Sequence, residues 1–155
     1  MANLNQFIQL IPKGAIWAQQ KEQEILQVGI PPSESQLQDA KLIPITQPET
    51  VRLLRVSAIP LPDDPELNFA AQAIKLITPQ TPGLSLRYGF FIREDYWNNR
   101  EIVVHELIHT AQYERLGSIQ EFFNQYIAEY IKYGFPAAPL EQEAINRTRL
   151  ICIQQ

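Results

Sequence analysis

Prolines interrupt the first half of this chain so often that long regular elements are not expected there. A proline inside a helix removes one hydrogen-bond donor and clashes with the preceding turn, and it is poorly tolerated in central strands. The elements between the prolines should therefore be short, and no single long helix is expected in this half. The ten prolines of this region are Pro12, Pro31, Pro32, Pro44, Pro48, Pro60, Pro62, Pro65, Pro79 and Pro82.

The spacing of apolar residues suggests what lies between these prolines. It predicts helices over Ala15–Val28 and Ser33–Leu42. Val51–Ile59 is rich in β-branched and aliphatic residues and predicts a strand, with a helix that starts after Pro48 as the alternative. Asp64–Ile77 follows helical spacing and begins with a residue type that caps helices.

The second half carries clearer signals. Leu84–Ile92 alternates between apolar and other residues, which is typical of a strand. Asn98 or Asn99 can cap a following helix that runs to Leu116 and ends at Gly117.

Two further helices complete the predicted elements. Ser118 and Glu121 form a capping-box pattern at the start of a helix that extends to Gly134. Because almost no loop separates this helix from the preceding one, the two are expected to pack as an antiparallel hairpin. Leu140–Cys152 predicts the last helix.

These elements predict an α+β fold that is mostly helical, with a short antiparallel sheet. A chain of 155 residues, 45% of them hydrophobic, can bury one sizeable core. We therefore expect a single domain over residues 1–155, with the chemically informative half at about 84–155.

The charge and composition of the chain exclude some classes of binding partner and indicate where the protein is found. The net charge is -4, and no run of Lys or Arg could follow a phosphate backbone, so nucleic acid is not an expected partner. The start lacks the pattern of a secretory signal and no stretch is long and apolar enough to span a bilayer, so we expect a cytoplasmic protein without a membrane partner. The single cysteine, Cys152, cannot form an intrachain disulfide.

The motif with the most chemical content is His105-Glu106-Leu107-Ile108-His109. Two histidines four residues apart lie on one face of a helix, where both imidazoles can bind one cation. Zinc suits such a pair, because a catalytic zinc site needs three protein ligands and keeps a position for water. Glu106 lies beside the pair, where a carboxylate can act as a general base toward that water.

The third zinc ligand should be a carboxylate, because the chain has no further histidine. Glu143 lies near the start of the last predicted helix. Glu129 would be level with the histidines if the two preceding helices pack antiparallel. Glu141 is favoured by neither argument.

Other residues could assist catalysis. A phenol or guanidinium aimed at the negative charge that develops during peptide hydrolysis would lower the barrier. The spacing does not select among Tyr88, Tyr113, Tyr126, Arg87 and Arg93. The strand predicted at Leu84–Ile92 could pair with an extended peptide substrate through main-chain hydrogen bonds.

The motif and its surroundings resemble the zincin superfamily of metallopeptidases. The resemblance covers roughly residues 84–146. It extends to small bacterial proteins with a His-Glu-Leu-x-His-x-x-Gln-Tyr helix, here ending at Gln112-Tyr113, and a downstream Glu-x-Glu-Ala, here ending at Glu143-Ala144. In thermolysin-type gluzincins the third ligand is a glutamate on a later helix, often followed by alanine. The resemblance therefore implies Glu143, with Glu129 as the alternative because its spacing is closer to theirs.

The expected function is that of a zinc metallopeptidase. Glu106 would be the general base, His105, His109 and Glu143 the zinc ligands, and a peptide or protein the substrate. The alternative is a non-catalytic zincin-like domain that binds zinc or a protein partner. An intact Glu106 argues against that alternative, since a purely structural site needs no base.

Overall fold

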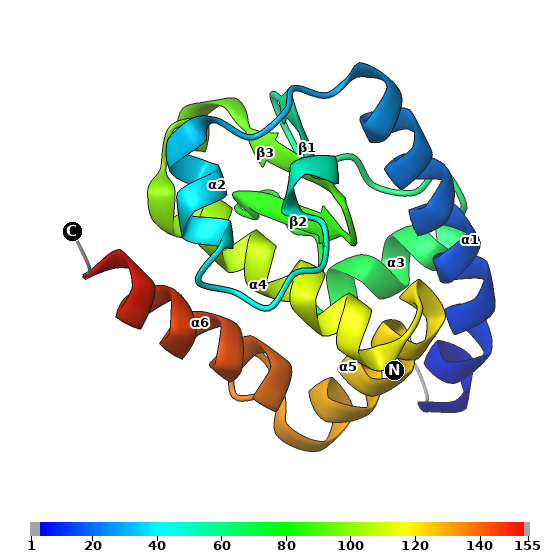
Figure 1. Ribbon diagram of the computed structural model, residues 1–155. Helices are drawn as coiled ribbons and strands as arrows, with labels where there is room; N and C mark the ends of the chain where they lie inside the picture. Colours follow the sequence, from blue (N-terminus) through cyan, green and yellow to red (C-terminus); the bar gives the residue numbers. More distant parts are fainter. Residues whose placement is uncertain (1–3, 154–155) are drawn as a thin grey trace.

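The computed structural model describes residues 4–153, which form an α+β fold of six α-helices and a three-stranded mixed sheet (Figure 1). None of the helices in this range has the length and hydropathy needed to cross a membrane. The elements are, in order, α1 (Leu4–Val28), α2 (Glu34–Ala40), the 3-10 turn η1 (Pro48–Thr50), β1 (Arg52–Val56), α3 (Pro65–Ala73), β2 (Gly83–Leu86), β3 (Gly89–Arg93), η2 (Glu94–Tyr96), α4 (Arg100–Leu116), α5 (Ile119–Tyr133) and α6 (Pro139–Cys152).

The first helix contradicts the expectation that prolines keep the helices and strands in the first half of the chain short. α1 has 25 residues and contains Pro12, and it begins at Leu4 rather than at Ala15. Pro12 removes only one backbone donor from the helix. The buried side chains of Ile11 and Ala15 lie on either side of it, so packing of this face offsets the lost hydrogen bond.

The sheet also differs from the prediction. Its strand order is β1-β3-β2, with β2 and β3 antiparallel but β1 and β3 parallel. The predicted single strand over Leu84–Ile92 is a hairpin, because the chain reverses at Arg87 and Tyr88. Arg87 has a φ of 75°, which the alternating apolar pattern does not predict for a non-glycine residue.

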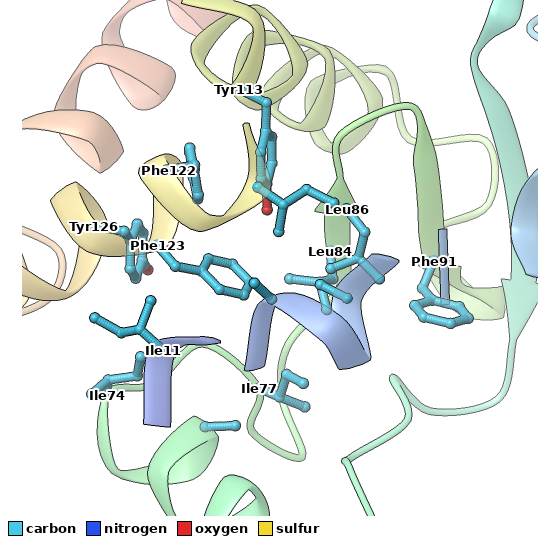
Figure 2. Close-up of a cluster of buried hydrophobic side chains, with 14 of the residues drawn as sticks. Ile11, Ile74, Ile77, Leu84, Leu86, Phe91, Tyr113, Phe122, Phe123 and Tyr126 are labelled. Carbon is cyan, nitrogen blue, oxygen red and sulfur yellow. The ribbon is translucent and has the colours of Figure 1, made fainter. Parts of the chain in front are cut away.

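Buried residues on the two faces of the sheet form two separate cores. Leu84, Leu86 and Phe91 face a cluster that includes side chains of α1, α3 and α5 (Figure 2). Phe90 and Ile92 face the other cluster, which includes side chains of α4 and α6. The sheet is therefore the middle layer of the fold.

The last three helices pack differently from a simple hairpin. α4 and α5 meet close to the turn at Gly117, where the rings of Tyr113 and Phe122 stack with their centroids 3.9 Å apart. Farther from this turn, α4 packs along α6 and α5 packs along α1. The residues of α6, rather than those late in α5, therefore lie beside the centre of α4.

Candidate metal centre

Helix α4 carries the His-Glu-x-x-His motif, and residues next to it in the sequence determine where the helix begins and ends. The Asn99 side chain accepts a hydrogen bond from the Ile102 N–H at 3.0 Å, so the second of the two predicted caps starts the helix. Gly117 ends the helix in the left-handed region, with a φ of 104°. Between them, His105 and His109 are one turn apart, and their rings meet edge to face.

A carboxylate from α6 completes a group of three potential metal ligands. Glu141 Oε1 is 3.0 Å from His109 Nε2, and Glu141 Oε2 is 3.4 Å from His105 Nε2. The two Nε2 atoms are 3.1 Å apart. His109 and Glu141 are buried and His105 is partly exposed, so the group lies at the bottom of an accessible cleft.

These separations fit a zinc ion. Ligands about 2.0–2.1 Å from a tetrahedral zinc are roughly 3.3 Å from one another. The two Nε2 atoms are 3.1 Å apart, and each lies close to one oxygen of the Glu141 carboxylate, Oε1 at 3.0 Å from His109 and Oε2 at 3.4 Å from His105, so each contact is near that value. Two imidazoles and one carboxylate are also a donor set that zinc prefers at catalytic sites.

The two glutamates ranked highest from the sequence lie elsewhere. Glu143 forms an ion pair with Arg115 and accepts a hydrogen bond from Gln112. Glu129 accepts hydrogen bonds from the Leu140 N–H and from Gln125. The structure thus brings Glu141, and neither of the two glutamates ranked above it, to the histidines, because the first turn of α6 points Glu141, and not the residue two positions later, toward them.

Gln112 connects the two helices that carry the ligands. The side chain is fully buried, and its Oε1 atom lies 2.7 Å from Nδ1 of His109. Its Nε2 atom donates to the Leu140 carbonyl at 2.9 Å and to Glu143 at 2.8 Å. If Oε1 accepts the proton of Nδ1, Nε2 of the same imidazole keeps its lone pair for a metal.

Glu129 holds the start of α6 from outside that helix. The residue before α6, Ala138, has no capping side chain, whereas Glu129 accepts from the Leu140 N–H at 2.7 Å. A carboxylate at this position also interacts favourably with the positive end of the helix dipole. Together, Glu129 and Gln112 hold both backbone polar groups of Leu140, the residue next to Glu141.

Glu106 lies beside the ligand group but is held by the sheet. The Ser85 backbone N–H donates a hydrogen bond to it. Burial raises the pKa of the Glu106 carboxyl, while the nearby His105 and His109 act in the opposite direction. The carboxylate is therefore next to the three potential metal ligands without being one of them.

The charges around the group favour a cation. Burial lowers the pKa of His109, but the negative charges of Glu141 and Glu106 outweigh this effect and raise the pKa to about 9. Burial likewise raises the pKa of Glu141, yet His109 and His105 together hold it well below its usual value. Two carboxylates that favour a positive charge on His109 this strongly would also favour a divalent metal ion.

The cleft above the group has a volume of about 520 Å³. Its lining includes two of the proposed assisting tyrosines, Tyr113 and Tyr126. The Tyr113 hydroxyl donates to the Ser85 carbonyl at 3.0 Å, and the Tyr126 hydroxyl hydrogen-bonds Glu141. Both rings also belong to the core shown in Figure 2, so they join the cleft to the packed interior.

The other three residues considered for this role are engaged away from the cleft. Tyr88 donates to Glu114, Arg87 pairs with the fully buried Glu22, and Arg93 pairs with Asp95. Their contacts anchor the hairpin and the segment that follows it.

Comparisons with protein-family models, with curated proteins and with solved structures found no match to this chain.

The sequence singled out His105, Glu106 and His109, but it indicated no role for Gln112 and pointed to Glu129 only as an alternative ligand, not as a support of α6. Gln112 is three positions after His109, so helical spacing places it on the same face as that ligand. This signal could have identified it as a partner of the imidazole. The contact between Glu129 and Leu140 had no comparable signal, because it depends on how α5 and α6 pack.

Proposed function

We propose that this protein is a zinc-dependent hydrolase that cleaves peptide bonds, with His105, His109 and Glu141 as the metal ligands and Glu106 as the general base. The observation that carries the proposal is the set of separations of 3.0 to 3.4 Å among the three ligand side chains, next to a buried carboxylate. The open cleft above them leaves room for water and a substrate.

A zinc ion held by these side chains would lower the pKa of a coordinated water to about 7 and polarise a substrate carbonyl. Glu106 accepts the proton of the attacking water and then delivers it to the leaving nitrogen. The hydrogen bond from the Ser85 N–H orients the Glu106 side chain for both transfers. Because the base is buried, little competing solvent reaches it.

The edge strand β2 supports a peptide as the substrate. Pro82 accepts a hydrogen bond from the Arg93 N–H, so the alternation of an antiparallel ladder directs the polar backbone groups of Gly83 and Ser85 toward the outer edge of the sheet. The Ser85 N–H is bound by Glu106, and the Ser85 carbonyl is bound by the Tyr113 hydroxyl. Gly83 lines the cleft, and its N–H and C=O can pair with an extended peptide.

Gly83 also lies close to the base. A Cβ atom added there would be 3.1 Å from the Ile102 side chain and 3.4 Å from Cγ of Glu106. Such an approach would crowd the floor of the cleft. A glycine therefore permits a substrate backbone to lie next to both the strand and Glu106.

The alternative is a zincin-like domain that binds zinc or a protein partner without turnover. A structural zinc site is usually closed by four protein ligands. Among the described residues, the group here has three ligands and an adjacent base. These features favour catalysis.

The test compares the zinc-loaded wild type with Glu106→Gln on a broad library of quenched fluorescent peptides, with metal content measured on both proteins. The wild type should cleave members of the library and lose this activity on chelation. Glu106→Gln should keep about one zinc per chain and lose at least ~100-fold in kcat. A wild type that binds zinc and cleaves no peptide would favour the non-catalytic alternative.

A further inference from the structure

One basic side chain in the cleft has no ionic partner. Lys75, on the segment between α3 and β2, lines the cleft together with the metal group. Within residues 4–153 it forms no ion pair. The other charged residues of the lining are Glu106 and Glu141, apart from the two histidines. A divalent cation would balance those two carboxylates and leave the Lys75 ammonium as the uncompensated charge.

The backbone at Lys75 adds a second observation. Lys75 has a φ of 60°, in the left-handed region. Its N–H donates to the Gln72 carbonyl and the Leu76 N–H donates to the Ala71 carbonyl, a pair of bonds that ends many helices. Glycine is the usual residue at this position, because a side chain is disfavoured there. The chain instead carries a long cationic side chain at the edge of the cleft.

The edge strand gives a reason why another contact is needed. Because Glu106 and Tyr113 bind the backbone of Ser85, β2 can pair with a peptide at Gly83 but not at the next outward-facing residue. Such short pairing would orient a substrate weakly. A charged contact elsewhere in the cleft would supply the missing orientation.

We propose that Lys75 binds a carboxylate of the substrate, so that the cleft selects peptides that carry a negative charge close to the cleaved bond. This inference rests on the function proposed above. The carboxylate can be the free C-terminus or the side chain of Asp or Glu. Gln72 and Gln80 also line the cleft and offer neutral donors to a bound substrate.

Binding of two peptide pairs to zinc-loaded Glu106→Gln tests the inference without turnover. One pair differs only in a free or amidated C-terminus, and the other only in Glu or Gln beside the cleavage site. Isothermal titration calorimetry should give tighter binding, by about fivefold, for the charged member of at least one pair. The pair that responds identifies the source of the carboxylate.

Variants of Lys75 in the same background assign the preference to this side chain. Lys75→Gly suits the backbone conformation, so it should fold and bind zinc normally while the preference disappears. Lys75→Arg should retain the preference. Lys41→Gln, which removes an exposed lysine after α2 and outside the cleft, is the matched control and should change nothing.

Two outcomes are separable. If both members of each pair bind equally well, or if Lys75→Gly keeps the preference, the role of Lys75 is wrong and the hydrolase proposal stands. If no peptide binds the zinc-loaded protein, the peptide-hydrolase proposal fails, and the role of Lys75 fails with it.

Discussion

Helices α4 and α6 both contribute ligands to the candidate metal centre, but they position them in different ways. On α4, His105, Glu106 and His109 are placed relative to one another by helical geometry alone, because four residues make about one turn. On α6, a single residue, Glu141, meets the histidines. Its position depends on where α6 starts and how it packs against α4.

The difference shows in what surrounds each ligand. The α4 ligands need a capped helix, and Asn99 and Gly117 supply its two ends. Glu141 instead depends on side chains from two other helices, Gln112 of α4 and Glu129 of α5, which hold the backbone of the preceding residue. A local motif can thus place two of the three potential ligands, while the position of the third depends on tertiary structure.

Removal of a ligand should have the largest effect and should be similar for the two helices. We expect His109→Ala and Glu141→Gln each to weaken zinc binding by at least ~100-fold, since each removes one of three donors. Competition with a chromophoric chelator measures the affinity. Glu143→Gln is the matched control, because its carboxylate faces Arg115, and it should lose less than about fivefold. A larger loss in Glu143→Gln than in Glu141→Gln would reverse the assignment of the third ligand.

Metal binding should also stabilise the fold, because the ligands bridge α4 and α6. At a free zinc concentration 100 times Kd, binding contributes about 2.7 kcal/mol to the free energy of unfolding. For a chain of this size that corresponds to a rise in Tm of about 5–10 °C, measurable by differential scanning fluorimetry with zinc and with chelator. In Glu141→Gln the rise at the same zinc concentration should nearly vanish. An unchanged rise in that variant would argue that zinc binds elsewhere.

The hydrogen bonds of Gln112 should matter less than the ligands but more than an ordinary polar contact. Gln112→Ala removes the partner of His109 Nδ1 and the side-chain donor to the Leu140 carbonyl. Loss of such an outer partner typically costs 10–100-fold in metal affinity, and we expect a change in that range. Gln120→Ala, at an exposed position early in α5, is the control and should retain wild-type affinity. Equal affinities in the two variants would show that helical geometry alone orients His109.

Much of the helical architecture could be predicted from the sequence. The caps predicted at Asp64 and Ser118 are both present, because a capping side chain bonds to backbone groups two or three residues away. The motif helix was likewise predictable at both ends. These features depend on neighbours in the chain.

The features that could not be predicted depend on distant neighbours. Pro12 suggested a helix boundary, yet burial of the surrounding face of α1 outweighs the missing donor. The reversal at Arg87 is hidden within a continuous alternating pattern, and Glu22 of α1 helps to hold it through two hydrogen bonds to the guanidinium. The choice of Glu141 has the same origin, since Glu141 and Glu143 lie two positions apart at the start of one helix, and only the packing of α6 decides which faces the histidines.

The smallest predicted effect concerns Glu129, the most distant support of the third ligand. Glu129→Ala removes the carboxylate that accepts from the Leu140 N–H at the start of α6, and loss of such a cap costs about 1 kcal/mol. If the first turn of α6 frays more often, Glu141 spends less time near the histidines, and zinc affinity should fall by about fivefold.

A purely structural role of Glu129 would lower Tm in the presence of chelator without changing zinc affinity, so both quantities must be measured. Glu129→Gln keeps an acceptor and should recover most of the affinity, whereas Glu121→Gln, at an exposed position early in α5, should match the wild type. An unaltered zinc affinity in Glu129→Ala would mean that Gln112 alone fixes the position of α6 at the metal centre.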